Sequence, residues 1–376
     1  MKQQFVIFFY TSFFDVKKYL PDNYIVIDNL DGLKGVKYLD YVYYNQELMI
    51  LTNFDEYKKI FFTIEINNMS FLDYKRPWIF DKDYLHYIVK KKNREGFERY
   101  FMEQITMKNK KQVGLFMKKD KLYIAKPIPG SGGIGIRVFN SKDSLFDYID
   151  NFELSNKDKK LFGSEKVRKW VLQEYISNPL LIDGKKIHLR VMGLLMNKDG
   201  VKSFHIFKKY FVYTAAKLFV LSNFNNENIH NSHGKKMTEE NLQQIILKFY
   251  SLYKSKIHLI TREIIKICEI IKRFLIYKCY SNNKNCYSLI GLDIMITTDF
   301  NVKLIEVNKR AGMSFLKSKV FNDDFIKGFL DLTLFEKNKT KDFVEIKDKN
   351  IKRKKNSEIK SVFLKNFNKK IEQIKN

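Results

Sequence analysis

Two acidic side chains and an amide are spaced as a metal site on a β-hairpin requires. A four-residue turn, Thr298 to Asn301, would place Asp293 directly opposite Glu306, and the two-residue period of a strand brings Asn308 to the same face. Opposed carboxylates repel each other unless a cation lies between them. Carboxylate and amide oxygens suit a hard ion such as Mg²⁺. The alternative is a polar strand face turned to solvent.

A glycine-rich segment near the middle of the chain has the composition of a phosphate-binding loop. It runs from Lys126 through Ser131 and Gly133 to Gly135, between two strand-like runs. Glycines let backbone N–H groups approach an anion closely. The segment is neither a Walker loop nor a dinucleotide fingerprint, because a strand rather than a helix follows it. A hairpin that covers phosphates fits best, and a plain surface turn is the alternative.

Three basic side chains alternate along a third segment. Lys186, His188 and Arg190 are two residues apart and therefore share one face of a strand. Such a row of cations suits a polyphosphate. The alternative is a solvent-exposed strand face.

The elements that must position these groups follow from patterning. Strands are predicted at Gln4–Tyr10, Tyr24–Ile27, Leu48–Thr52, Leu122–Lys126, Ile136–Phe139, Lys169–Ile176, Lys186–Met196, Lys202–Tyr213, Ser288–Thr297 and Val302–Asn308. Helical character is predicted at Asp81–Lys111, after Ser141, and over Met237–Tyr277 with Thr238 and Asn241 as caps. In the final hairpin Leu292, Ile294, Ile305 and Val307 are expected to face the core.

Composition limits the class of protein. The chain has 376 residues, 45% of them hydrophobic, which is typical of a globular protein. The formal net charge of +27 indicates an acidic partner, either nucleic acid, an anionic surface or an acidic protein, or else a solvated basic face. No run approaches the ~20 apolar residues of a membrane span, and the short apolar N-terminus fits a strand better than a signal peptide. We therefore expect a cytoplasmic protein.

Cysteine usage is also informative. Cys268, Cys279 and Cys286 are odd in number and lie in no CxxC or Cys/His pattern. This argues against a disulfide framework or a zinc site and favours thiols in a reducing compartment.

The order of these motifs resembles the tubulin tyrosine ligase-like family of the ATP-grasp superfamily. The stretch from Trp170 to Arg190 is similar to the family's "QxYixxPlLidgrKFDiR". The segments ending in Asp293 and Asn308 resemble its "GxDxxxD…LlEvN". The likeness covers about residues 120–310.

The resemblance implies an α/β (α+β) ATP-grasp fold in which two β-sheet lobes clasp ATP. The expected division is 1–80 as an N-terminal α/β lobe, 81–177 and 178–335 as the central and C-terminal ATP-grasp lobes, and 336–376 as a basic tail. It also implies a carboxylate–amine ligase that uses ATP and Mg²⁺ and adds an amino acid to an acidic protein, such as a tubulin tail.

The implied roles fall into four sets. Phosphate contacts come from Lys126, Ser131, Gly133, Gly135 and Lys186. The hinge beside adenine comprises Gln173, Glu174, Tyr175 and Ile176. Magnesium ligands are Asp293, Glu306 and Asn308. Catalysis involves Lys186, His188 and Arg190, with Arg190 on the γ-phosphate, and Ser232 and His233 near the nucleotide and acceptor.

Departures from the family pattern concentrate on the acceptor side. His188 replaces the aspartate of "KFD", and Tyr213 or Thr214 stands where the next strand has an arginine. Both arginines of "SRGRG" are missing, and His233 replaces the asparagine of "HLTN". Other hypotheses are therefore a ligase for a different substrate, an inactive ATP-binding protein, and a basic nucleic-acid-binding protein.

Overall fold

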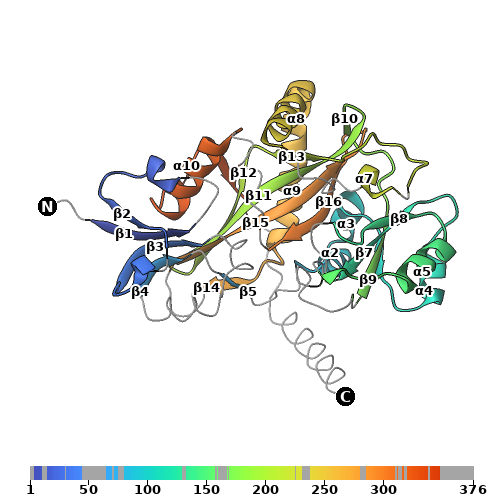
Figure 1. Ribbon diagram of the computed structural model, residues 1–376, viewed down its shortest axis with the longest axis horizontal. Coiled ribbons are helices and arrows are strands. Elements are labelled where there is room, and N and C mark those ends of the chain that lie inside the picture. The colour runs from blue at the N-terminus through green and yellow to red at the C-terminus, as the bar shows by residue number, and fades with distance from the viewer. Residues whose placement is uncertain are drawn as a thin grey trace, which may run out of the picture. The chain divides into compact units, whose positions relative to one another are not determined.

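A large mixed β-sheet is the framework of the computed structural model (Figure 1). The structure describes residues 4–10, 15–29, 31–44, 65–69, 72–74, 80–128, 133–156, 159, 167, 169–224, 226–230, 238–279, 285–309, 311, 316, 320–337 and 339–347. The described residues through Ile346 belong to one compact unit. The strand predicted at Leu48–Thr52 lies outside the described residues.

The central strands of this sheet are antiparallel, and those at its N-terminal end are parallel. The order is β17-β12-β11-β15-β4-β3-β1-β2, with β10 and β13 also paired to β11, and β16 to β15. Their bounds are β1 Phe5–Tyr10, β2 Tyr24–Ile27, β3 Tyr38–Tyr44, β4 Glu65–Met69, β10 Leu181–Ile182, β11 Lys185–Lys198, β12 Val201–Phe207, β13 Phe211–Thr214, β15 Asn285–Ile296, β16 Val302–Asn308 and β17 Phe343–Glu345.

The two longest strands, β11 and β15, run side by side through the centre of Figure 1. β11 continues into β12 through a two-residue turn at Asp199 and Gly200, which have φ of 48° and 83°. Positive φ at both turn residues is the geometry that matches strand twist in a tight hairpin. The predicted hairpin is thus confirmed.

Helices pack against this sheet and bury its apolar side chains. The helices are α2 Tyr84–Lys92, α3 Arg94–Tyr100, α7 Glu227–His230, α8 Glu239–Leu252, α9 Ile257–Lys272 and α10 Asn322–Thr333, with 3₁₀ turns at Val16–Tyr19, Asp31–Leu33 and Lys254–Lys256. The strongly amphipathic α9 buries Ile260, Ile264, Ile267 and Ile271 at helical spacing. One apolar core joins α2, α3, α8, α9 and α10 to β1, β3, β11, β12 and β15.

A smaller antiparallel sheet forms the second lobe, at the right of Figure 1. It has the order β6-β9-β7-β8, from β6 Gln104–Thr106, β7 Tyr123–Ile128, β8 Arg137–Phe139 and β9 Lys169–Glu174. Helices α4 Lys110–Phe116 and α5 Lys142–Asp150 accompany it. One face packs Trp170, Leu172 and Tyr123 into a separate apolar core. Lys126 and Gln173 lie on the opposite face, together with the apolar Val171.

Three helix and strand predictions need correction. The strand expected at Lys202–Tyr213 is two strands, β12 and β13, which pair with different parts of β11. The helix expected over Met237–Tyr277 breaks at Lys254–Lys256 into α8 and α9. Of the two predicted caps, Thr238 caps α8, because its side chain accepts from the N–H of Asn241, which lies inside the helix. The segment Asp81–Lys111 contains strand β6 between its helices.

The basic tail cannot begin at Glu336. Phe343–Glu345 forms strand β17, which pairs with β12, and Phe343 is buried. The N-terminal strands β1 to β4 likewise belong to the same sheet as β11 and β15. The other domain boundaries stay predictions.

The expectation for the cysteines was wrong for two of the three. Cys279 and Cys286 form a disulfide, with Cα atoms 5.4 Å apart, between β15 and strand β14 Tyr277–Cys279, which pairs with β5 Leu72–Tyr74. Sequence spacing could not predict this pair, because it depends on where β14 lies beside β15. Cys268 is a buried free thiol, as expected.

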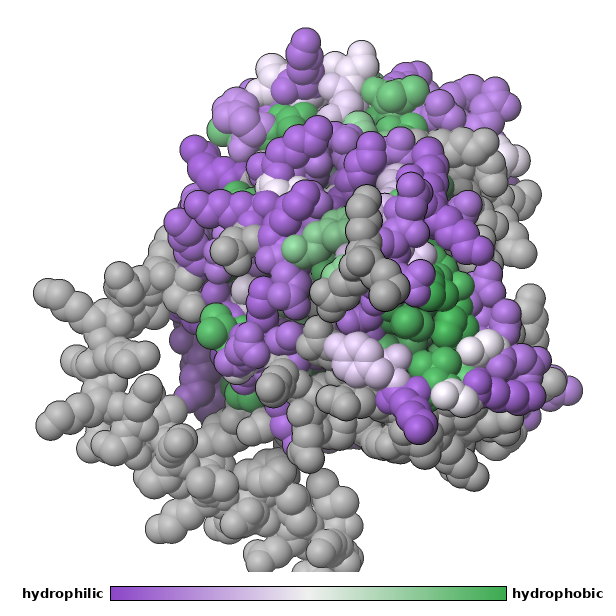
Figure 2. All heavy atoms as spheres, turned by 90° about the vertical axis from the view of Figure 1, so that its left-hand side faces the viewer, coloured by the Kyte–Doolittle hydropathy of each residue, from purple (hydrophilic) through white to green (hydrophobic). Residues whose placement is uncertain are grey.

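The surface is largely polar on the side shown in Figure 2, with a smaller apolar area. Within the described part of the chain, no helix has the length and apolar character to cross a membrane.

Candidate active site

The predicted acidic hairpin is present, although its geometry differs from the simple expectation. Asp293 on β15 lies opposite Glu306 on β16, but a bulge follows, so that Ile294 is opposite Leu304. The extra residue is Ile305, which is only half-buried, while Leu304 takes the core position expected for Ile305. A tighter turn and a bulge together therefore produce the predicted acid pair.

The acid pair is enclosed by further polar groups. Asp293 is 3% exposed, and the Nδ2 of Asn308 donates to its Oδ2 at 3.1 Å. The Nζ of Lys82, ahead of α2, lies 4.0 Å from Glu306 Oε2. The carboxylates of Asp293 and Glu306 and the amide oxygen of Asn308 are hard oxygen donors, the type of ligand that Mg²⁺ prefers.

Arg190 forms the central contact between β11 and the acidic hairpin. It is opposite Asp293 in the strand register, and its Nε and Nη2 donate to Oδ1 and Oδ2 at 2.6 and 3.2 Å. Burial disfavours the charged guanidinium, but Asp293 outweighs this and raises the pKa of Arg190 above its ordinary value. The neighbouring Gly291 makes room, because a Cβ there would lie 3.0 Å from Arg190 Cδ.

His188 lies one strand period before Arg190, on the same face. Its ring stacks on Tyr213 of β13 with centroids 5.1 Å apart and planes 13° from parallel. Its Nε2 is 4.0 Å from Asp293 Oδ1. The guanidinium of Arg190 also lies over the Tyr213 ring, at 5.7 Å. Of the two residues considered for the position of the missing arginine, Tyr213 is therefore the one that faces the site.

Lys186 ends the basic row in a buried hydrogen-bond cluster. Its Nζ donates to the Tyr175 hydroxyl and to the His230 carbonyl, both at 3.1 Å. The Tyr175 hydroxyl is 2.7 Å from His230 Nδ1, and His230 Nε2 is 3.0 Å from the Asn223 carbonyl. His230 therefore donates from Nε2 and accepts from Tyr175. Burial and the nearby Lys126 lower the pKa of Lys186 to about 7.

Lys126 approaches from the smaller lobe. It is 6% exposed on β7, and its Nζ donates to Gln173 Oε1 at 2.7 Å. Burial lowers the pKa of Lys126 to about 8, although the charge of Glu306 opposes this shift.

The basic row on β11 is buried, because Lys186, His188 and Arg190 are each less than 10% exposed. The alternative of a solvent-exposed strand face is therefore wrong for β11.

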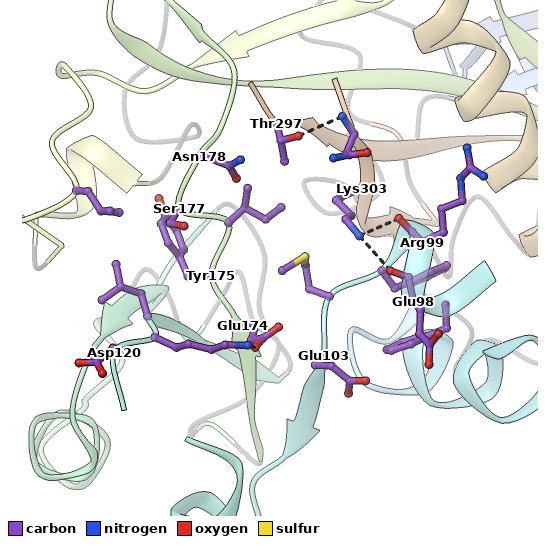
Figure 3. A pocket seen from close by; sticks show the side chains of 18 residues that line it. Glu98, Arg99, Glu103, Asp120, Glu174, Tyr175, Ser177, Asn178, Thr297 and Lys303 are labelled. Atoms are coloured by element: carbon purple, nitrogen blue, oxygen red, sulfur yellow. Dashed lines mark hydrogen bonds and ion pairs between the residues drawn. The ribbon is translucent and has the colours of Figure 1, made fainter. Parts of the chain in front are cut away.

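Three of the four predicted hinge residues, all except Gln173, border a cavity of about 750 Å³ between the two lobes. Glu174, Tyr175 and Ile176 line one side, and Lys303 from β16 lines the other, donating to the carbonyls of Glu98 and Arg99 (Figure 3). Lys126, Lys186 and Arg190 are not part of this lining. The cavity is therefore at the hinge end of the site, and Tyr175, which accepts from Lys186, lies between it and the basic row.

The glycine-rich loop is described in part. Gly133 and Gly135 have φ of 78° and 70°, a conformation that glycine adopts readily. A Cβ on Gly135 would also lie 2.8 Å from the Phe152 ring. Ser131, and the predicted Ser232 and His233, lie outside the described residues.

Two residues of the site were missed by the sequence analysis. Lys82 and His86 lie in a charged helical segment whose pattern gave no sign that it faces the sheet. His86 is 2% exposed beside Gln173. The Lys-Asp pair at the start of α2 was the available signal, but lysine is common throughout this chain.

Comparison with solved structures defines the class of fold. The C-terminal domain of K. lactis Pby1, described as an ATP-grasp enzyme interacting with the mRNA decapping enzyme Dcp2, superposes with a TM-score of 0.54. The match has 19% sequence identity and covers 92% of this chain and 99% of that one. The chain therefore has the ATP-grasp fold, as predicted.

The family follows from sequence comparison. The model of the Tubulin-tyrosine ligase family matches residues 73–316, so the chain belongs to that family. Tubulin glycylase 3D of Tetrahymena thermophila is 26% identical over 220 residues, which cover 52% of this chain and 19% of that protein. Probable tubulin–tyrosine ligase PBY1 of Saccharomyces cerevisiae is 24% identical over 231 residues, 50% and 30% of the two chains. The chain thus spans less than a third of these two relatives.

Proposed function

We propose that the protein is an ATP- and Mg²⁺-dependent ligase that joins a carboxylate to an amine through an acyl-phosphate. The observation that carries this proposal is that one site holds two desolvated ammonium groups, Lys126 and Lys186, together with the acid pair Asp293 and Glu306, whose charges act on Lys126. Burial lowers the pKa of both lysines, and Lys126 lowers that of Lys186 further, so these cations need an anion. The two opposed acids in turn need a cation. Magnesium and a polyphosphate satisfy both needs.

The residues have distinct roles in this proposal. Lys126 and Lys186 hold the phosphates, and Arg190 exchanges Asp293 for the transferred γ-phosphoryl oxygens. Asp293, Glu306 and Asn308 hold Mg²⁺, which would neutralise negative charge on the phosphoryl oxygens. Because these groups come from both lobes, lobe closure would also exclude water from the reactive acyl-phosphate.

The reaction balances without a protein nucleophile. A carboxylate oxygen attacks the γ-phosphorus, the bond to the β-phosphate oxygen breaks, and ADP leaves. The amine nitrogen then attacks the acyl carbon, phosphate leaves, and the amine loses a proton. The protein therefore contributes position and charge rather than a covalent intermediate.

The acceptor we favour is an acidic protein, with an amino acid as the second substrate. This follows from the net charge of +27 and from family relatives named as tubulin glycylases and as a probable polyglutamylase. The stacked pair of His188 and Tyr213 favours a second candidate, an ATP-binding protein with altered or lost acceptor use. Release of ADP with and without amine substrates distinguishes the two.

An ATP-dependent labelling assay with Glu306→Ala tests the proposed function. Wild type is incubated with labelled glycine, glutamate or tyrosine and with tubulin or small amine acceptors. We expect Glu306→Ala to lower turnover by ~100-fold or more. Asp331→Ala is the matched control, because Asp331 on α10 has a similarly exposed side chain (25% against 21% for Glu306) but pairs with Lys337. Equal rates for wild type and Glu306→Ala would rule out the metal assignment.

A further inference from the structure

We propose that His86 is a positioning residue that fixes the orientation of Gln173 and, through it, the ammonium group of Lys126. This proposal rests on the proposed function, because it assigns Lys126 to the nucleotide. The four groups involved come from four elements: His86 from α2, Gln104 from β6, Lys126 from β7 and Gln173 from β9. His86 belongs to none of the motifs that suggested the family.

The hydrogen bonds around Gln173 allow one orientation of its amide. Its Oε1 accepts from Lys126 Nζ at 2.7 Å, while its Nε2 lies 3.0 Å from Gln104 Oε1 and 3.1 Å from His86 Nε2. Rotating the amide by half a turn would set a donor against the ammonium and an acceptor against Gln104. Both amide hydrogens are used in the observed orientation, one of them by the imidazole.

This arrangement requires a neutral imidazole at position 86. Because the Gln173 amide donates, His86 Nε2 must be the acceptor and the ring proton must be on Nδ1. The surroundings favour a neutral ring, because it is 2% exposed and lies edge-to-face with Phe101 at 5.0 Å and Phe97 at 6.3 Å. Within the described structure the buried Nδ1 has no hydrogen-bond partner, so the contact with Gln173 alone sets the tautomer. Burial and the charge of Lys126 lower the pKa of His86 to about 3. The ring therefore stays an acceptor at physiological pH.

A fixed Gln173 amide in turn fixes the direction of the Lys126 ammonium group. In the described part of the chain its ammonium makes one hydrogen bond, to Gln173, which leaves two of three N–H donors for phosphate oxygens. The competing partner is Glu306, whose charge acts on Lys126. If Gln173 turned, the ammonium would move toward that carboxylate, which we assign to the metal. His86 thus keeps the phosphate-binding and metal-binding charges apart.

Substitution of His86 tests the proposal through MgATP binding, measured by titration calorimetry with the full chain. His86→Leu removes the acceptor, whereas His86→Gln can place a carbonyl oxygen near the position of Nε2. We expect the Kd for MgATP to rise ~10-fold in His86→Leu, the size of one lost buried hydrogen bond to a charged network, and to stay within ~2-fold of wild type in His86→Gln. The rescue separates positioning from general packing.

His205→Leu is the matched control, because His205 is also a buried imidazole, 6% exposed, whose Nε2 contacts Ser203 on β12. It should lower the unfolding temperature without changing the Kd. If His86→Leu does not unfold cooperatively, His86→Met, whose unbranched side chain adapts to irregular spaces, takes its place. Unchanged affinity in the apolar variant, or equal weakening in His86→Gln, would overturn the proposal. Failure of wild type to bind MgATP would instead overturn the proposed function.

Discussion

Lys186 offers a test in which a substitution that harms nucleotide binding makes the empty protein more stable. Burial and Lys126 lower its pKa from 10.5 to about 7, which corresponds to a cost of about 5 kcal/mol for the charged form. Lys186→Met removes that cost and loses two hydrogen bonds, to Tyr175 and His230, of about 1 kcal/mol each. We expect a net gain of ~2–3 kcal/mol in the free energy of unfolding at pH 6.5.

The dependence on pH has a definite sign. A lysine whose pKa is lower in the folded state binds fewer protons there than in the unfolded state, so stability rises with pH between about 7 and 10.5. The cost is fully present below pH 7 and disappears as pH approaches 10.5. The stability advantage of Lys186→Met should therefore shrink by about 3 kcal/mol between pH 6.5 and pH 9.5.

Urea unfolding of the nucleotide-free protein at pH 6.5, 8 and 9.5 measures both effects. Lys198→Met is the control, because Lys198 ends the same strand with a side chain 38% exposed and paired to Glu336. Calorimetry with MgATP measures the loss of binding separately. A difference between wild type and Lys186→Met that does not change with pH would refute the argument that Lys186 is a desolvated cation.

Two further predictions concern packing and the disulfide. Gly291→Ala should displace Arg190, reduce ATP-dependent turnover and lower the free energy of unfolding by ~1–3 kcal/mol. Gly114→Ala in helix α4 is the control and should be neutral or stabilising, because a Cβ has room there. Thermal unfolding and ADP release are measured for both variants, and equal results for the two would show that Arg190 does not need the space beside Gly291. Reduction of the Cys279–Cys286 disulfide, or its replacement by serines, should lower the free energy of unfolding by ~2 kcal/mol, given the short loop that it closes. Titration of three reactive thiols in the unreduced, denatured protein would contradict the disulfide.

The sequence predicted those parts of the site that depend on strand periodicity. The side chains of Asp293 and Glu306 lie opposite each other, and Lys186 shares a face with Arg190, because two-residue alternation holds along regular strands. The bulge after Asp293 was not predictable, since a tighter turn plus one extra residue gives the same pairing at the acids.

The contacts made between distant segments were not predicted. Lys82 and His86 reach the site because α2 lies beside the smaller sheet, and no local pattern in a lysine-rich helix marks that face. The disulfide likewise depends on the position of β14 next to β15. The division into β12 and β13 depends on their pairing with different parts of β11. Such features arise from tertiary packing, which periodicity does not encode.

The register between β11 and β15 limits how this chain can vary in length. A one-residue insertion between Lys186 and Arg190 would turn part of the basic row into the apolar core and bring leucine or valine against Asp293. Extra residues at the Asp199–Gly200 turn would leave every one of these pairs intact, because the turn lies beyond the paired segment. Descendants of this sequence can therefore lengthen the hairpin tip freely, while the central ladder must keep its residue count.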